Sequence, residues 1–178
     1  MLDLSRNELL SRLNNLDKEA YFLYKSSKRF KMIIVGSSSL ILSELISRKT
    51  IDIDSIYVSN ELLPLLEKYD FNTRAETYIN NFPYNFEDRT VLFLAGQQID
   101  YFVPSLEDIV ISKLCAARLE DKNDVMSEGV LKKINWDLLE FLATDDGELK
   151  SSILNERNYM DFLYEYNEFV RRCKPCES

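Results

Sequence analysis

Hydrophobic positions along the first half of the chain follow two periods, one typical of helices and one of strands. Residues 7–26 place leucines and aromatic residues three and four positions apart, which predicts an amphipathic helix. The run Met32-Ile33-Ile34-Val35 is short, apolar and followed by Gly36-Ser37, so it predicts a buried strand. The leucines and isoleucines of residues 38–46 predict a short helix capped by one of the serines.

A second strand and a hairpin follow in the pattern. Residues 50–58 alternate between apolar and polar positions, which predicts a half-buried strand. Its isoleucines form one side and its aspartates the other: Ile51, Ile53 and Ile56 against Asp52 and Asp54. Asn60 can cap a leucine-rich helix. Apolar runs at 90–94 and 99–103, joined by Ala95-Gly96-Gln97-Gln98, predict a β-hairpin.

The second half of the chain is helical in pattern. Ser105 and Asp108 have capping-box spacing, at the start of a helix that runs to about residue 118. Helical signals continue from residue 122, with Asn135 as a cap and Gly147 as a break. We therefore expect an α/β (α+β) fold, a mixed central sheet flanked by helices with a helical C-terminal extension. The expected partition is an N-terminal helix (1–30), a core (31–125) and the extension (126–178) within a single compact domain.

Composition removes several classes of function. The 178 residues correspond to roughly one domain. With 22 Lys and Arg against 30 Asp and Glu, the net charge of −8 argues against a duplex-DNA binder, whose affinity comes largely from neutralising phosphates. The absence of histidine excludes His-based triads and zincin motifs, and four glycines are too few for a glycine-rich dinucleotide fingerprint.

We expect a cytoplasmic protein without a membrane partner. No apolar run approaches the ~20 residues that span a bilayer, and the first residues lack the layout of a signal peptide. The three cysteines, Cys115, Cys173 and Cys176, are an odd number in a chain of this kind, so reduced thiols are expected. Cys173 and Cys176 form a C-x-x-C without the second pair that would complete a zinc site.

The pair Asp52 and Asp54 is the first candidate for chemistry. Residues i and i+2 of a strand face the same way, with Cα atoms ~6.6 Å apart. Two carboxylates this close repel by roughly 2.5 kcal/mol at an effective dielectric of ~20. A divalent cation reverses the sign of that interaction because hard metals take several oxygen ligands. The alternative is a solvated strand face, or ion pairs with Arg48 and Lys49.

Two further positions fit a phosphate and metal site. Gly36-Ser37 ends a strand and opens a helix, where free backbone N–H groups favour phosphate, and glycine admits a close backbone approach. The alternative is a plain strand-to-helix turn. Asp100 stands in an otherwise apolar strand, where a buried charge needs a partner or a metal. Its alternative is an outward position on an exposed sheet face.

These pieces together resemble the nucleotidyltransferase (DNA polymerase β-like) superfamily. The resemblance lies in Ile34-Val35-Gly36-Ser37 followed by Thr50-Ile51-Asp52-Ile53-Asp54. Arg48 to Asp54 is similar to the Arg-x-Thr-x-Asp-Ile-Asp of one branch, which holds small bacterial nucleotidyltransferase-like proteins and the nucleotidyltransferases of abortive-infection toxin–antitoxin systems. Ser55 departs from the pattern because that position is usually hydrophobic.

A second group of motifs is similar to the same branch. Ser105-Leu106-Glu107-Asp108, the run Lys113 to Arg118, and Asp121 with Asp124 match its Ser-x-Glu-Asp, Lys-Leu-x-Ala-x-Arg and Asp-x-x-Asp. The resemblance covers roughly residues 30–126. For Arg118 and Asp121, three positions apart, a surface helix pair is the alternative, and for Asp121 and Asp124 a solvated helix face.

The resemblance implies a nucleotidyltransferase fold and a set of site residues. Asp52, Asp54 and Asp100 would bind two Mg²⁺ ions, with Asp100 also accepting the acceptor's proton. The backbone after Gly36, Ser37 and Lys113 would contact the phosphates of a nucleoside triphosphate. The remaining motif positions are secondary candidates: Ser38, Arg48, Thr50, Arg118, Asp121 and Asp124.

The implied activity is transfer of a nucleoside monophosphate from an NTP such as ATP to an unknown acceptor, which tRNA, a protein hydroxyl or a small molecule would fit. A role as a toxin–antitoxin component with an antitoxin partner is part of the same resemblance. The alternative is a catalytically silent binding or regulatory protein of this fold, and a metal-dependent nuclease is a weaker one.

Two further features have more than one interpretation each. A basic patch could steer RNA or be a solvated helix end, and it comprises Lys25, Lys28, Arg29 and Lys31. An aromatic segment could stack a base, line an acceptor site or be local core, and it comprises Tyr78, Phe82, Tyr84 and Phe86.

Overall fold

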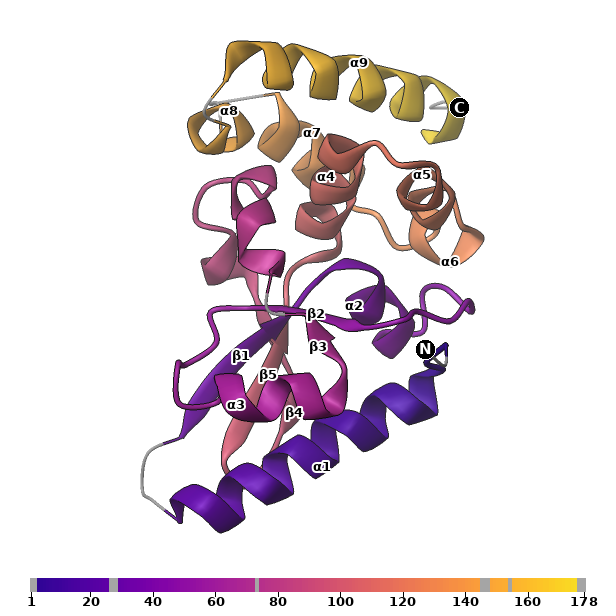
Figure 1. Ribbon diagram of the computed structural model, residues 1–178. Helices are drawn as coiled ribbons and strands as arrows, with labels where there is room; N and C mark the ends of the chain where they lie inside the picture. Colours follow the sequence, from indigo (N-terminus) through magenta and orange to yellow (C-terminus); the bar gives the residue numbers. More distant parts are fainter. Residues whose placement is uncertain (1–2, 26–28, 73, 145–147, 154, 176–178) are drawn as a thin grey trace. The chain divides into compact units, whose positions relative to one another are not determined.

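The computed structural model describes residues 3–25, 29–72, 74–144, 148–153 and 155–175. The chain divides into two compact units (Figure 1). The sheet unit comprises Met1–Thr77 and Thr90–Pro104, and the helical unit comprises Tyr78–Arg89 and Ser105–Ser178. The partition expected from the sequence, with a core that ends at residue 125, stays a prediction.

Five strands of the sheet unit form one mixed sheet in the order β3-β2-β1-β5-β4. Central β1 is antiparallel to β2 and parallel to β5, and the β4–β5 hairpin is antiparallel, as its sequence predicts. At the other side, β2 pairs in parallel with β3. The strands are β1 (Phe30–Ile34), β2 (Ile53–Ile56), β3 (Phe71–Asn72), β4 (Val91–Ala95) and β5 (Ile99–Val103).

Helix α1 (Arg6–Tyr24) supplies one side of the main core and confirms the predicted amphipathic helix. Its start carries a capping box in which Ser5 and Glu8 bond each other's backbone N–H groups. Its buried face is set by helical spacing and packs on apolar residues of β1 and β5: Leu9, Leu13, Leu16 and Ala20. The other helices of this unit are α2 (Gly36–Leu42), α3 (Leu63–Leu66) and the 3-10 turn η1 (Glu67–Tyr69).

A buried carboxylate joins α1 to the β4–β5 hairpin. Asp17 accepts hydrogen bonds of 2.8 Å from the backbone N–H groups of Gln97, Gln98 and Ile99. A Cβ atom on Gly96 would lie 2.4 Å from an oxygen of Asp17, so the turn requires glycine at this position. A side-chain acceptor on the helix thus satisfies the backbone donors of the hairpin turn.

In the helical unit, α4 (Leu106–Ala116) packs against α5 (Leu119–Val125), α7 (Trp136–Ala143) and α9 (Glu156–Cys173). Ser105 and Asn135 accept backbone N–H groups at the starts of α4 and α7, which confirms both predicted caps. The long α9 buries aromatic side chains at helical spacing: Tyr159, Phe162, Tyr166 and Phe169. The remaining elements are η3 (Phe86–Arg89), α6 (Glu128–Leu131) and α8 (Glu148–Ser152); η2 (Ala75–Asn81) crosses the boundary between the units. The break predicted at Gly147 lies outside the described residues.

The architecture confirms the predicted fold class, a mixed sheet with flanking helices and a long C-terminal helix. One strand is shorter than the sequence predicts: β2 spans Ile53–Ile56, whereas the pattern predicts residues 50–58. The preceding Thr50 instead pairs its backbone with Leu4, and Ile51 is 53% exposed. Among the described residues no helix has the length and hydropathy to cross a bilayer.

We predict that Asp17→Ala lowers the free energy of unfolding by about 3–5 kcal/mol, because three backbone N–H groups lose a charged acceptor in the interior. Urea unfolding followed by circular dichroism measures the change. The control is Asp161→Ala, an exposed aspartate of α9, which should stay within about 0.5 kcal/mol of wild type. An equal, small effect of both substitutions would contradict the anchoring role of Asp17.

Candidate functional site

The candidate site begins where β1 ends beside β2. Because these strands are antiparallel, the Val35 N–H donates to the Asp54 carbonyl at 2.9 Å, which places Gly36 beside the Asp54 side chain. Gly36 has φ +64°, and a Cβ built on it would lie 2.6 Å from Asp54 Oδ2. Any other residue would carry both backbone strain and a clash. The structure therefore brings together two residues that the sequence selected separately.

Asp54 is held from its other side by Asn72. The two residues are in register across the β2–β3 pair, and Asn72 Nδ2 donates to Asp54 Oδ1 at 2.8 Å. The sequence does not mark Asn72 as a site residue, since a two-residue strand shows no periodicity. Asp52 is half-buried and precedes β2, so the strand spacing assumed for the aspartate pair does not apply to it.

The guanidinium group of Arg48 lies against the start of α2. Arg48 donates from its guanidinium to Ser37 Oγ at 2.6 Å and to the Lys49 carbonyl at 3.0 Å. Ser38 is buried and bonds the Val35 carbonyl at 2.9 Å, so its hydroxyl is committed to the helix start. Thr50 forms backbone hydrogen bonds with Leu4. Of the secondary candidates in this unit, Arg48 thus donates a hydrogen bond to Ser37.

Asp100 is not brought to this corner, which corrects the expectation that it joins Asp52 and Asp54. It is level with Lys31 on β1, whereas Asp54 is level with Val35, four residues or roughly 13 Å further along the strand. The two aspartates also lie on opposite sides of β1. Asp100 instead forms an ion pair with Arg29, whose Nε donates to it at 2.9 Å. Asp100 is only partly buried, and its charge in this otherwise apolar strand is paired with an arginine.

The acidic residues of this corner fit one hard cation rather than two. Within the part of the chain that the structure describes, no group of three His, Cys, Asp or Glu side chains is placed to hold a metal. Asp54 has the amide of Asn72 as a neighbour, and Asp52 lies one residue before β2. Mg²⁺ is commonly bound by one or two carboxylates together with substrate phosphates and water. The donor set therefore suits a cation that arrives with a phosphate ligand.

The helical unit gathers four of the candidates into a buried ionic cluster. Lys113 Nζ donates to Asp121 at 2.7 Å and to Asp124 at 2.9 Å, and all three side chains are 3–4% exposed. Arg118 pairs with Asp121 at 2.6 Å from the surface. The predicted i,i+3 pair therefore forms, but the solvated-face alternative for Asp121 and Asp124 is wrong. Lys113 serves as counter-ion to two carboxylates of its own unit.

Neighbouring motif residues are also internal to the helical unit. Asp108 is fully buried and accepts from the Arg89 guanidinium at 2.8 and 2.9 Å, and Glu107 accepts from the Asn135 N–H at 2.7 Å. The sequence marks Asp108 as a capping and motif residue. The position of Asp108 in the first turn of α4 does not indicate that Arg89, 19 residues earlier, is its partner. All four acidic residues of the Ser-x-Glu-Asp and Asp-x-x-Asp motifs thus have structural partners.

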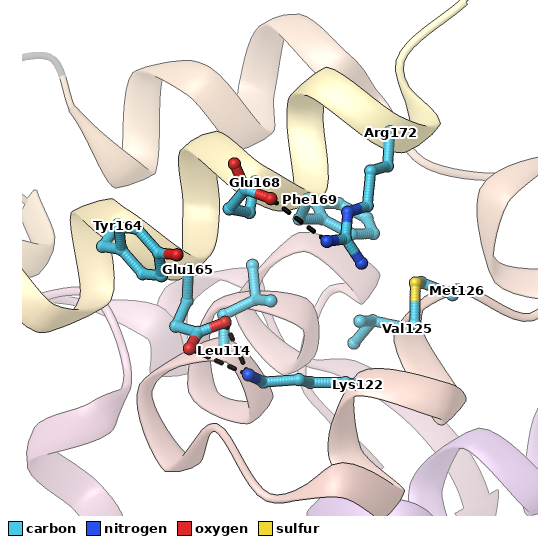
Figure 2. A pocket seen from close by; sticks show the side chains of 9 residues that line it. All are labelled: Leu114, Lys122, Val125, Met126, Tyr164, Glu165, Glu168, Phe169 and Arg172. Carbon is cyan, nitrogen blue, oxygen red and sulfur yellow. Dashed lines mark hydrogen bonds and ion pairs between the residues drawn. The ribbon is translucent and has the colours of Figure 1, made fainter.

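A cavity of about 130 Å³ lies between α5 and α9 in the helical unit (Figure 2). Phe169 is part of its wall, and the ion pairs Lys122–Glu165 and Arg172–Glu168 border it. Pockets for ligands of drug or nucleotide size are usually about 300–1,000 Å³. This cavity is therefore too small for a nucleotide.

The remaining surface features have local roles. In the aromatic segment, Phe82 and Phe86 are buried and stacked at 4.6 Å, while Tyr78 and Tyr84 are exposed. In the basic patch, Arg29 is paired with Asp100 and Lys31 lies over the Phe102 ring at 4.6 Å; Lys28 lies outside the described residues.

Two cysteines are described, and both are free thiols. Burial raises the pKa of the Cys115 thiol to about 12, which keeps it neutral and unreactive near pH 7. Burial also raises the pKa of the Cys173 thiol, and the nearby Arg172 charge opposes that shift. Cys176 lies outside the described residues, so the C-x-x-C pair stays a sequence feature.

Comparison with known families identifies one match. The model of a family described as nucleotidyltransferase of unknown function (DUF6036) matches residues 11–174. That match includes both the corner around Gly36 and Asp54 and the ionic cluster of the helical unit. No curated protein and no solved structure matches the chain.

We predict that Gly36→Ala lowers the free energy of unfolding by about 1–3 kcal/mol, because alanine at φ +64° is strained and its methyl group meets the Asp54 carboxylate. A double-mutant cycle with Asp54→Ala, measured by urea unfolding, separates the two causes. The clash should appear as a coupling energy of about 0.5 kcal/mol or more. Strictly additive effects would contradict the close contact.

We predict that Lys113→Met lowers the free energy of unfolding by about 3–5 kcal/mol, since two buried carboxylates lose their shared cation. The triple variant Lys113→Met/Asp121→Asn/Asp124→Asn should recover much of this loss. The matched control is Lys133→Met, an exposed lysine, with a change within about 0.5 kcal/mol. A mild effect of Lys113→Met would show that the cluster is not a structural charge balance.

Proposed function

The chain belongs to the DUF6036 nucleotidyltransferases, and we propose that its sheet unit binds a Mg²⁺–nucleoside triphosphate and transfers the nucleoside monophosphate to an acceptor, with release of pyrophosphate. The observation that carries the proposal is the contact of Gly36 with Asp54 beside the Arg48–Ser37 pair. It puts a carboxylate, a hydroxyl and a guanidinium at one end of one strand pair.

The phosphate side of the site is assigned to Gly36, Ser37 and Arg48. The missing Cβ of Gly36 makes room for the Asp54 carboxylate, and the Ser37 hydroxyl is a hydrogen-bond donor at the same turn. The Arg48 guanidinium keeps a fixed positive charge against that hydroxyl and has the planar donor fork that suits phosphate. Lys113, expected from the resemblance to contact the phosphates, is occupied by Asp121 and Asp124 and is left out of this assignment.

Asp52 and Asp54 are the residues that would hold Mg²⁺. The bound ion would neutralise charge on the phosphates and polarise the phosphorus under attack. Asn72 orients the Asp54 carboxylate by a hydrogen bond to Oδ1, which leaves Oδ2 on the Gly36 side. The sheet unit provides ligands for this nucleotide-associated ion, and the second ion expected from the resemblance lacks the carboxylate of Asp100.

A catalytically silent, nucleotide-binding protein of the same family is the second candidate function. It is favoured by the Asp100–Arg29 ion pair, because an active enzyme of the expected kind needs three carboxylates that converge. In place of a third carboxylate, Asp54 has an amide neighbour that cannot accept a proton from an acceptor hydroxyl. Nucleotide binding is common to both candidates, and transfer distinguishes them.

The acceptor and the biological setting rest on the resemblance alone. RNA, a protein hydroxyl and a small molecule are each compatible with attack by a hydroxyl on the α-phosphate. A role in a toxin–antitoxin system has its support in the motifs around Arg48 and Lys113. Neither assignment is needed for the binding experiment below.

We predict that isothermal titration detects Mg²⁺-dependent binding of at least one of ATP, GTP, CTP and UTP. Asp52→Ala/Asp54→Ala should abolish it, because the metal and its phosphate ligands lose both carboxylates. The control is Asp100→Asn, which keeps hydrogen-bond acceptance toward Arg29 and should bind like wild type. Circular dichroism verifies that each variant is folded.

Transfer is then measured with the bound nucleotide labelled at its α-phosphate, in the presence of total tRNA or of the protein itself. Label on either acceptor, lost in Asp54→Asn, supports the transferase. Binding without transfer to any acceptor supports the silent protein. The absence of binding by all four nucleotides to folded wild type would refute the nucleotide site in both forms.

A further inference from the structure

The two edges of the sheet are unlike each other. One edge is β3, which has two residues and offers little backbone for pairing. The other edge is β4, Val91–Ala95, a full strand without a charged residue or proline. Among the described residues, β4 has a strand partner only on its β5 side. Proteins usually protect such an edge with lysine, proline or a covering segment, because open edge strands pair with other chains.

Apolar side chains of β4 are exposed on both faces of the sheet. Val91 is 58% exposed and Leu92 is 54% exposed, and neighbouring residues of a strand point to opposite faces. A strand that adds beside β4 would cover both side chains while it pairs with the backbone. The one protective feature at this edge is the irregular register between Leu92 and Leu94.

The edge is also held rigid. Asp17 binds three backbone N–H groups of the turn that links β4 to β5, and Arg29 donates to the carbonyls of Gly96 and Gln97 at 2.8 and 3.0 Å. The Tyr101 hydroxyl of β5 donates to the Leu13 carbonyl of α1 at 2.8 Å. These bonds fix the hairpin from both sides of its turn. A rigid strand loses little conformational entropy on binding, which favours association.

We propose that β4 pairs in an antiparallel manner with β4 of a second copy of this chain, which joins the two sheets edge to edge. An antiparallel edge is complementary to itself, since each N–H faces a carbonyl of the same strand in the other copy. Ten consecutive residues, 90–99, carry no charge, so no like charges oppose each other along the seam. A chain with a net charge of −8 otherwise repels its copy, which makes this neutral segment a favourable place for contact.

The area buried between the two β4 strands determines how strong the proposed dimer is. Pairing of two five-residue strands, with Val91 and Leu92 as the apolar contribution, buries less than the about 1,200 Å² typical of stable interfaces. The dimer is therefore weak, with a dissociation constant on the order of micromolar. Because the remaining charges of the two copies repel, added salt strengthens the association.

Sedimentation equilibrium of the full chain tests the proposal over about 1–200 µM, a range that brackets a micromolar constant. The average mass of wild type should rise from 20.9 kDa toward twice that value. Val91→Lys and Leu92→Lys each place a charge on the seam and should weaken the dimer at least about tenfold. The matched control is Leu119→Lys, which also replaces an exposed apolar residue by lysine but lies on α5, and it should dimerise like wild type.

Hydrogen exchange locates the interface. Amide exchange of residues 91–95 should slow as the concentration rises, and it should not slow in Val91→Lys. A wild type that stays at 20.9 kDa throughout overturns the proposal and leaves β4 as an edge for an extended segment of a different protein. A dimer that survives both β4 substitutions, or that is lost in Leu119→Lys, also overturns it.

Discussion

The close approach of Gly36 to Asp54 is the constraint on which the candidate site depends. Gly36 turns out of β1 with a positive φ, and the Asp54 carboxylate occupies the place where a Cβ would stand. The antiparallel β1–β2 pair sets this approach through the bond from the Val35 N–H to the Asp54 carbonyl. Asn72 then fixes the other oxygen of the carboxylate. The site is thus a product of strand register, which positions one carboxylate against the backbone of Gly36.

Ion pairs determine which of the other charged residues are available to bind a metal or a phosphate. Asp100 is a site candidate because it is a charge in an apolar strand, and Lys113 is one because of the family resemblance. Asp100 has Arg29 as its partner, and Lys113 has Asp121 and Asp124. Each charge is paired within its own unit of the chain. A motif of charged residues can therefore have a purely structural basis while it still marks a family.

The two ends of β1 lie beside different groups of charged residues. At its C-terminal end the chain opens into the corner around Gly36, where charges converge. At its N-terminal end Arg29 is linked to the β4–β5 turn and to Asp100, and Asp17 of α1 binds the same turn. This second network joins the hairpin turn to α1 and to the start of β1, and of its charged residues Asp17 is buried while Arg29 is exposed.

Helices, hairpins and caps are predictable from the sequence, because each depends on local periodicity or local backbone geometry. The α1 amphipathic pattern, the β4–β5 hairpin and the caps at Ser105 and Asn135 were predicted because each is encoded within a few neighbouring residues. The same is true of the turn at Gly36, whose glycine precedes a run of serines.

Tertiary structure alone decided which distant charges meet. Register across β1 separates Asp100 from Asp54, and the two-residue strand β3 brings Asn72 to that carboxylate. Pairing of Thr50 with Leu4 shortens the predicted strand and leaves Asp52 before it. A long-range partner is selected by packing of the whole chain, and the residues around a charge do not reveal which opposite charge or amide will face it. That is why the motif residues were found in the sequence while their partners were not.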